Sequence, residues 1–196
     1  MSVPPAPPLL LASVSPQRRA ILEQLHIPFD LVTPRYHEHD VEDDPVALVR
    51  THAVGKARSV AQQAGDRPVL AVDTAVVVDA TAFGKPSGPE QAERMLEALS
   101  GRTHEVISGL CLLTRAWEEV AHERTAVTFR PLAPRDIAYY VHEGEWRDRA
   151  GAYAIQGLGA GLVERIEGDY LNVVGLPAAL LVRILGERFA GVYGFG

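Results

Sequence analysis

The apolar positions of this chain fall into two patterns that alternate from one end to the other. Short apolar runs predict β-strands, and apolar residues that recur every three or four positions predict amphipathic helices. The predicted strands are Leu9–Ala12, Phe29–Thr33, Pro68–Val78, Thr103–Thr114, Val120–Phe129, Leu162–Ile166 and Tyr170–Val174. The predicted helices begin beside Pro16, Pro45, Pro89, Pro134 and Pro177 and end near His26, Gly65, Leu99, His142 and Phe189. This alternation predicts an α/β fold built on a mixed sheet.

The lengths of the connections indicate which strands pair. Thr103–Thr114 and Val120–Phe129 are expected to form a long hairpin. Leu162–Ile166 and Tyr170–Val174 are expected to pair around the turn-forming residues between them. Pro68–Val78 is apolar on both faces, which is typical of a strand in the centre of a sheet.

The segment after the first strand has the composition of a helix N-terminus. Ser13 and Ser15 offer hydroxyl groups to the first helical N–H groups, and Pro16 fits the first helical position. Arg18 and Arg19 follow in the first turn. Free N–H groups, the helix dipole and two arginines would suit a phosphate. Taken alone, the segment is more typical of a capped core helix with two solvated arginines.

Asp73 is the most anomalous residue of the chain, because it interrupts the otherwise apolar strand Pro68–Val78. A carboxylate in a buried strand is unfavourable unless it is paired, hydrogen-bonded or bound to a metal. It could be a structural residue bonded to backbone at a strand bend. A functional role is favoured, because Thr74 places a second polar side chain beside it.

Three other polar segments are less specific. Lys85 lies in a turn that lacks the glycine spacing of a P-loop, so by itself it is expected to be solvated. Ala150–Gly159 is a run of small residues with one amide side chain, Gln156, and fits a close approach to a flat ligand as well as a tight turn. The acidic residues between Glu38 and Asp44 are typical of a solvated loop.

Composition limits the classes of protein to consider. The 196 residues are 47% hydrophobic and carry a formal net charge of -6, which fits a folded core and disfavours a nucleic-acid binder. The single cysteine, Cys111, cannot form an internal disulfide and fits a reducing compartment. Neither a signal-peptide pattern nor a membrane-spanning run is evident. We therefore expect a cytoplasmic protein with a proline-rich disordered tail over residues 1–8, one domain over 9–190 and a short tail over 191–196.

Seven motifs in their order along the chain resemble the Maf family of nucleoside triphosphate pyrophosphatases. The resemblance extends from Leu9 to Phe189. The motifs are Leu11–Arg18 (Leu-Ala-Ser-x-Ser-Pro-x-Arg), Lys56-Ala57, Asp73-Thr74, Gly84-Lys85-Pro86, Leu99–His104, Ala150–Gly157 and Val174–Pro177. The resemblance implies the elongated α/β fold of the inosine triphosphate pyrophosphatases, with two lobes around a central cleft. It also implies hydrolysis of a nucleoside triphosphate to a monophosphate and pyrophosphate, a divalent cation (Mg²⁺, Mn²⁺ or Co²⁺) and a homodimer.

The resemblance assigns roles to particular residues. Asp73 would act as general base and, with Glu38, would bind the metal. Lys56 and Lys85 would be catalytic cations that neutralise phosphate charge. The substrate-binding residues would be Ser13, Ser15, Gln17, Arg18, Thr74 and Gln156.

Departures from the family pattern bear on the metal and the substrate. Gln17 replaces the arginine that dTTP- and UTP-hydrolysing members carry after Ser-Pro, whereas Thr74 and Gln156 match that branch. An amide can hydrogen-bond a base edge but lacks the charged fork of arginine. His37 stands where the first of two acids usually lies, which makes Glu38 the weaker metal assignment. Pyrimidine or modified pyrimidine substrates, and a role in clearing the nucleotide pool, are therefore the hypothesis.

Two other functions stay open at this point. The chain could be a nucleotide-binding regulator of septum formation with little turnover. It could also be an inosine triphosphate pyrophosphatase proper, although its motifs are not those of that family. The enzyme is favoured, because a pure nucleotide binder gains nothing from a buried carboxylate facing a triphosphate.

Overall fold

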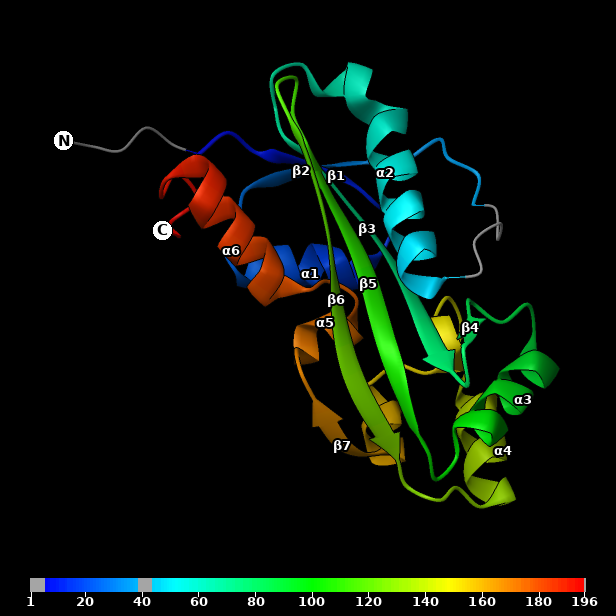
Figure 1. Cartoon of the computed structure of the whole chain (residues 1–196). Coiled ribbons are helices and arrows are strands. Elements are labelled where there is room, and N and C mark those ends of the chain that lie inside the picture. The colour runs from blue at the N-terminus through cyan, green and yellow to red at the C-terminus, as the bar shows by residue number, and fades with distance from the viewer. Residues whose placement is uncertain (1–5, 39–43, 196) are drawn as a thin grey trace. The chain divides into compact units, whose positions relative to one another are not determined.

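The structure is a computed structural model that describes residues 6–38 and 44–195 (Figure 1). Most of the expected N-terminal tail, the acidic residues Asp40, Glu42 and Asp43, and Gly196 lie outside the described residues. The strands are β1 (Leu9–Ala12), β2 (Phe29–Val32), β3 (Val69–Val78), β4 (Thr81–Phe83), β5 (Thr103–Leu113), β6 (Glu118–Phe129) and β7 (Val163–Glu167). The α-helices are α1 (Pro16–Gln24), α2 (Pro45–Ala64), α3 (Pro89–Leu99), α4 (Pro134–Glu143), α5 (Tyr170–Val174) and α6 (Ala178–Phe189). Two 3₁₀ turns, η1 (Ala150–Ala152) and η2 (Gly157–Leu162), complete the described elements.

The seven strands of the described residues belong to one mixed sheet, which confirms the predicted fold class. The strand order is β2-β1-β3-β5-β6-β7, and β4 pairs with β3 off this path. β1 runs parallel to both β2 and β3, with Leu10 opposite Asp30 on one side and Val69 on the other. β7 pairs antiparallel with β6 across a register shift at Thr128 and Phe129. β3 is a central strand, as its apolar pattern predicts.

The contacts divide the chain into two compact units, which we describe separately. Unit 1 comprises residues 1–73, 108–123 and 175–196, and unit 2 comprises residues 74–107 and 124–174. The long strands β3, β5 and β6 contribute residues to both units. Within the described residues, no helix combines the length and the apolar character needed to span a membrane.

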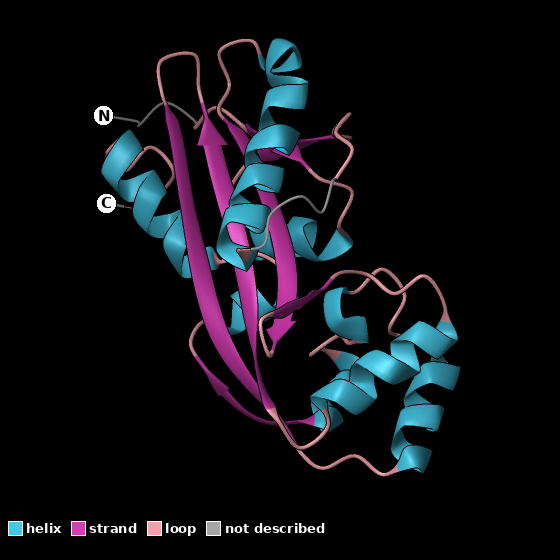
Figure 2. Cartoon of the chain, turned by 45° about the vertical axis from the view of Figure 1, so that its right-hand side comes forward, coloured by secondary structure: helices cyan, strands magenta, loops and turns pink. Residues whose placement is uncertain are grey.

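In unit 1, helix α2 packs against one face of the sheet (Figure 2). Residues on one side of α2 form a core with residues of β1, β3 and β5: Leu10, Ala12, Ala53, Ala57, Val60, Ala64, Val69, Ala71 and Cys111. Figure 1 shows α1 and α6 on the opposite side of these strands. Both faces are thus covered, which explains why β1 and the first half of β3 are continuously apolar.

A glycine brings α2 unusually close to the sheet. A Cβ atom added at Gly109 on β5 would lie 2.3 Å from the carbonyl oxygen of Val49 on α2. This distance is well inside van der Waals contact, so the helix backbone rests directly on the strand only because residue 109 has no side chain. The position of α2 relative to β5 therefore depends on Gly109.

Unit 2 has a core of its own. Helices α3 and α4 bury their apolar stripes against the strands, with Leu96, Leu99, Ile137 and Tyr140 among the buried side chains. The buried ring of His104 meets the rings of Phe129 and Tyr153 edge-on. Its Nε2 atom lies 2.9 Å from the Tyr153 hydroxyl, and burial lowers the pKa of His104 to about 4. His104 is therefore a neutral structural group at physiological pH.

The prediction of a strand over Tyr170–Val174 is wrong, because these residues form the short helix α5. The Asp169 carboxylate accepts a hydrogen bond from the N–H of Leu171 at 2.8 Å, which starts a helical turn. The buried amide of Asn172 then donates to the carbonyl of Val106 and to the hydroxyl of Thr125. These local and tertiary hydrogen bonds override an apolar pattern that fits a strand. The strand β7 therefore pairs with β6 and not with the segment Tyr170–Val174.

We predict that Gly109→Ala destabilises the fold by about 1–3 kcal/mol, because the methyl group must force α2 away from β5. Urea unfolding of the two proteins measures this loss. Gly161→Ala is the matched control, since nothing lies within 4 Å of a Cβ atom at that position. The control should stay within about 0.5 kcal/mol of the wild type. Equal stability of the two variants would contradict the close approach.

Candidate active site

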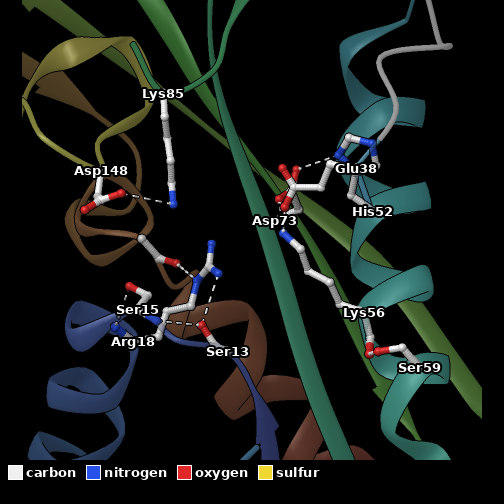
Figure 3. A network of polar contacts seen from close by, with 11 residues as sticks. Ser13, Ser15, Arg18, Glu38, His52, Lys56, Ser59, Asp73, Lys85 and Asp148 are labelled. Atoms are coloured by element: carbon white, nitrogen blue, oxygen red, sulfur yellow. Dashed lines mark hydrogen bonds and ion pairs between the residues drawn. The ribbon is translucent and has the colours of Figure 1, made fainter. Parts of the chain in front are cut away.

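Asp73 lies at the centre of a cluster of charged side chains in unit 1 (Figure 3). The ammonium nitrogen of Lys56, on α2, lies 2.5 Å from Oδ1 of Asp73 and 2.6 Å from Oε1 of Glu38. The Lys56 and Asp73 side chains are only 11% and 13% exposed, whereas that of Glu38 is 53% exposed. One lysine thus bridges two carboxylates, one from a strand and one from the segment after β2. The structure thus brings together Asp73, Lys56 and Glu38, three of the residues to which the resemblance assigns a role.

A fourth member, His52, escaped the sequence analysis as a site residue. Its Nδ1 atom lies 3.3 Å from Oδ2 of Asp73, on the oxygen that Lys56 does not contact. His52 and Lys56 are four residues apart on α2, so their side chains lie on the same face of the helix. That spacing is the signal that could have identified His52, once Lys56 was assigned to the site.

The surroundings of Asp73 determine its charge. Burial raises the pKa of its carboxyl group. This effect is outweighed by the hydrogen bond from His52, the charge and hydrogen bond of Lys56, and the charge of Arg18, all of which lower the pKa. The resulting pKa lies below the ordinary value, so Asp73 is ionised at neutral pH. Burial also lowers the pKa of Arg18, against the opposing effect of Asp73 and Glu38. An arginine remains charged nonetheless.

Helix α2 also holds the segment that carries Glu38. The hydroxyl of Ser59 accepts a hydrogen bond from the backbone N–H of Arg35 at 3.1 Å. The ring of Tyr36 lies over Gly55, where an added Cβ atom would be 2.2 Å from its Cε2 atom. The same ring meets His52 edge-on, with 5.8 Å between ring centroids. Glu38 therefore approaches Lys56 from a segment that is fixed on α2 by one hydrogen bond and one aromatic ring.

The turn between β1 and α1 forms the capped helix N-terminus that the sequence predicts. Ser15 is the N-cap, and its hydroxyl accepts from the N–H of Arg18 at 3.5 Å and donates to the side-chain oxygen of Gln17 at 3.0 Å. The hydroxyl of Ser13 accepts from the N–H of Ser15 and from the Arg18 guanidinium. Arg18 also donates from Nε to the carbonyl of Gly175 at 2.9 Å. The guanidinium is thus held in place in unit 1, where its charge acts on Asp73.

The remaining expected site residues belong to unit 2. Thr74 follows Asp73 on β3 and is partly buried. Lys85 is exposed, and its ammonium lies 3.9 Å from a carboxylate oxygen of Asp148. The turn with Lys85 contacts the small-residue loop, because the N–H of Gly151 donates to the carbonyl of Gly84 at 3.1 Å. Gln156 is exposed on the same loop.

The small-residue loop is tightly packed around Gly151. Gly151 has a φ of +68°, and a Cβ atom there would lie 2.7 Å from the side chain of Val76. The hydroxyl of Tyr140 accepts from the N–H of Ala154 at 2.9 Å. The sequence left a tight turn and a ligand-approaching loop as equal alternatives for this segment. The packing shows that the segment forms a tight turn, and the exposed Gln156 lies on it.

The residues around Asp73 fit a divalent cation. Glu38, His52 and Asp73 each offer a ligand atom, and these atoms lie within 4.8 Å of one another. Two carboxylates suit Mg²⁺ or Mn²⁺, and an imidazole suits the transition metals. Each carboxylate presents one oxygen to Lys56, and the other oxygen of Asp73 faces Nδ1 of His52. The donor set is therefore adequate for a cation that also binds phosphate oxygens.

Comparisons with known proteins identify the family of the chain. The family described as Maf-like protein matches residues 8–188 of the chain. The chain belongs to the Maf-like family. Among its relatives are proteins named dTTP/UTP pyrophosphatase from Deinococcus radiodurans, Symbiobacterium thermophilum and Moorella thermoacetica.

These Maf-like relatives align over nearly their full lengths. The Deinococcus radiodurans protein is 44% identical over 97% of each chain. The Symbiobacterium thermophilum protein is 48% identical over 91% of this chain and 93% of its own, and the Moorella thermoacetica protein is 48% identical over 95% and 97%. The solved structure of the Staphylococcus aureus Ham1 protein matches with a TM-score of 0.46 and 12% identity, covering 63% of this chain and 72% of that one. A likeness at this level carries no argument about the site.

We predict that the Asp73 carboxyl of the metal-free Maf-like protein titrates below its ordinary pKa of 3.8. A lowered folded-state pKa stabilises the fold above the unfolded-state value, and this stability is lost as the pH falls through the folded-state value. Urea unfolding should therefore show the wild type losing stability relative to Asp73→Asn below about pH 4.

A carbon-13 NMR titration of the carboxyl group measures the pKa directly. In Lys56→Met the same carboxyl should titrate at a higher pH, because the desolvation remains while the neighbouring positive charge is gone. A wild-type value above 3.8 would contradict the assigned pairing.

We also predict that Gly55→Ala weakens divalent-cation binding by about tenfold or more, because the new methyl group displaces Tyr36 and with it Glu38. Elsewhere in a helix, the same change would simply add about 1 kcal/mol of stability. Calorimetric titration with Mn²⁺ measures the effect. In a Tyr36→Ala background, Gly55→Ala should not weaken Mn²⁺ binding further. The same loss of Mn²⁺ affinity in that background would refute the role of the ring.

Proposed function

We propose that the protein is a nucleoside triphosphate pyrophosphatase that acts on pyrimidine nucleotides, with dTTP, UTP or a modified pyrimidine as substrate. The observation that carries this proposal is the ionised, largely buried Asp73 beside Lys56 and Glu38 in a chain of the Maf-like family. The names of the relatives support the substrate class.

In the proposed reaction, a water molecule attacks the α-phosphorus of the bound nucleotide. Asp73 accepts a proton from this water as the new P–O bond forms, and the bond from the α-phosphorus to the bridging oxygen breaks. The products are a nucleoside monophosphate and pyrophosphate. The negative charge of the triphosphate raises the pKa of Asp73, which makes this carboxylate a better base in the complex than in the free protein.

Positive charges stabilise the reacting phosphates. Lys56 orients Asp73 through the bond to Oδ1 and offers a cation at the reacting phosphate. Arg18 and the N-terminus of α1 contribute positive charge in unit 1. The family resemblance assigns Lys85 as a further catalytic cation. Glu38 and Asp73 would hold a divalent cation, which when bound neutralises phosphate charge and lowers the pKa of water.

Recognition of the base is assigned to amide and hydroxyl side chains. Gln17, Thr74 and Gln156 can donate to and accept from a pyrimidine edge, whereas the serines of the β1–α1 turn suit phosphate or sugar oxygens. The match of Thr74 and Gln156 to the pyrimidine branch supports this assignment. By the family resemblance, we also infer a cytoplasmic homodimer that clears nucleotides and binds neither membranes nor nucleic acid.

The test is release of pyrophosphate from a panel of nucleoside triphosphates in the presence of Mg²⁺, Mn²⁺ or Co²⁺. We expect metal-dependent turnover of dTTP or UTP. Asp73→Asn should lower kcat by about 10²- to 10⁴-fold, because it removes the proton acceptor. Asp66→Asn is the matched control, since Asp66 is an exposed carboxylate paired with Arg115.

The other outcomes separate the competing functions. Tight nucleotide binding without turnover by the wild type would replace the enzyme with a nucleotide-binding regulator. Preference for inosine triphosphate would move the protein to the deaminated-purine class. Full activity in Asp73→Asn would refute the assigned base.

A further inference from the structure

We propose that His52 is a nitrogen ligand of the divalent cation and that it makes this site favour Mn²⁺ or Co²⁺ over Mg²⁺. The proposal deepens the proposed function and rests on it, because it concerns the cation of the same reaction. It adds a ligand that the family motifs do not contain, since His52 lies outside all seven of them.

The first support is the division of the carboxylate oxygens. Lys56 contacts Oδ1 of Asp73, whereas Nδ1 of His52 lies beside Oδ2. Lys56 likewise contacts Oε1 of Glu38. The lysine and a cation can therefore share both carboxylates without competing for the same oxygen, and the oxygen that remains on Asp73 is the one that faces the imidazole.

The second support is the spacing of the two donor atoms. Metal–ligand bonds of about 2.1 Å place neighbouring ligand atoms about 3.0 Å apart in an octahedral site and about 3.4 Å apart in a tetrahedral one. Nδ1 of His52 and Oδ2 of Asp73 are 3.3 Å apart, which lies between these values. The same distance is long for a charge-assisted hydrogen bond between nitrogen and oxygen. The spacing therefore fits two ligands of one ion, and a bound ion would take the place of the long hydrogen bond between His52 and Asp73.

The third support is the fixed position of the ring. His52 is 3% exposed, and the ring of Tyr36 packs edge-on against it. Helix α2 is itself held on the sheet by the close approach at Gly109. The imidazole is therefore preorganised, so little freedom is lost when it binds an ion.

The chemistry of the donor set gives the metal preference. Mg²⁺ binds oxygen ligands and keeps several waters, whereas imidazole nitrogen is a common ligand of Mn²⁺, Co²⁺ and their neighbours. Coordination uses the lone pair of Nδ1, so the ring proton must lie on Nε2. Two carboxylates and one imidazole leave the other coordination positions for water or phosphate oxygens.

The deciding experiment is pulsed electron paramagnetic resonance on protein loaded with Mn²⁺ alone and with Mn²⁺ plus α,β-methylene-dUTP, which cannot be hydrolysed between the α- and β-phosphates. A coordinated imidazole gives a nitrogen modulation, and labelling the histidines with nitrogen-15 should change it to that of the heavier isotope. The modulation should vanish in His52→Asn, which places an amide near the position of Nδ1. It should persist in His122→Asn, since His122 is an exposed histidine on β6.

Calorimetric titration gives the size of the effect. His52→Asn should weaken Mn²⁺ binding by about tenfold or more and Mg²⁺ binding much less, so that the preference between the two metals narrows. Bound Mn²⁺ without a histidine signal, or no bound Mn²⁺ in either sample, would overturn the proposal. A histidine signal in a protein that hydrolyses no nucleotide would uphold the ligand and refute the proposed function instead.

Discussion

The site depends on the buried ion pair between Lys56 and Asp73. A carboxylate in the middle of a central strand is costly to desolvate, and the ammonium group 2.5 Å away offsets that cost. For Lys56 to reach Asp73, α2 must have one position along the sheet and one rotation about its own axis. Removing Lys56 would leave the buried Asp73 carboxylate without its nearest cation, which is more unfavourable than never having built the pair.

Several constraints act together to place α2. Asp44 caps its first turn, its small and apolar residues pack on β1 and β3, and Gly109 lets its backbone touch β5. These features belong to the fold rather than to the reaction. Because they fix the helix, they also fix the direction in which His52 and Lys56 point. The segment before Glu38 then follows the helix, through Tyr36 and Ser59.

The sequence singles out Asp73 because this residue breaks an apolar pattern, and a break of that kind has few structural explanations. It also predicted the cap at Ser15, since serine before proline has a clear local role. Lys56 and Glu38 were assigned only through the family resemblance, because a lysine on a helix and a glutamate in an acidic loop are ordinary solvated residues. His52 was missed for the same reason. A side chain's burial depends on which face of α2 meets the sheet, and a single helix with several polar positions does not specify that face.

Long-range contacts also explain the error at Tyr170–Val174, where Asn172 bonds to residues 66 and 47 positions earlier in the chain.

The division of the chain into two interleaved units has a consequence for synthesis on the ribosome. Residues 74–107 and 124–174, which make up unit 2, have all emerged before the last segment of unit 1, residues 175–196, is made. Unit 1 cannot be completed until its earlier parts meet that final segment. The nascent chain must therefore keep the strand β1 and the helix α2 available, while their apolar faces lack part of their cover. The emergence of residues 175–196, rather than that of the N-terminal half, is the event that allows the Asp73 unit to reach its complete core.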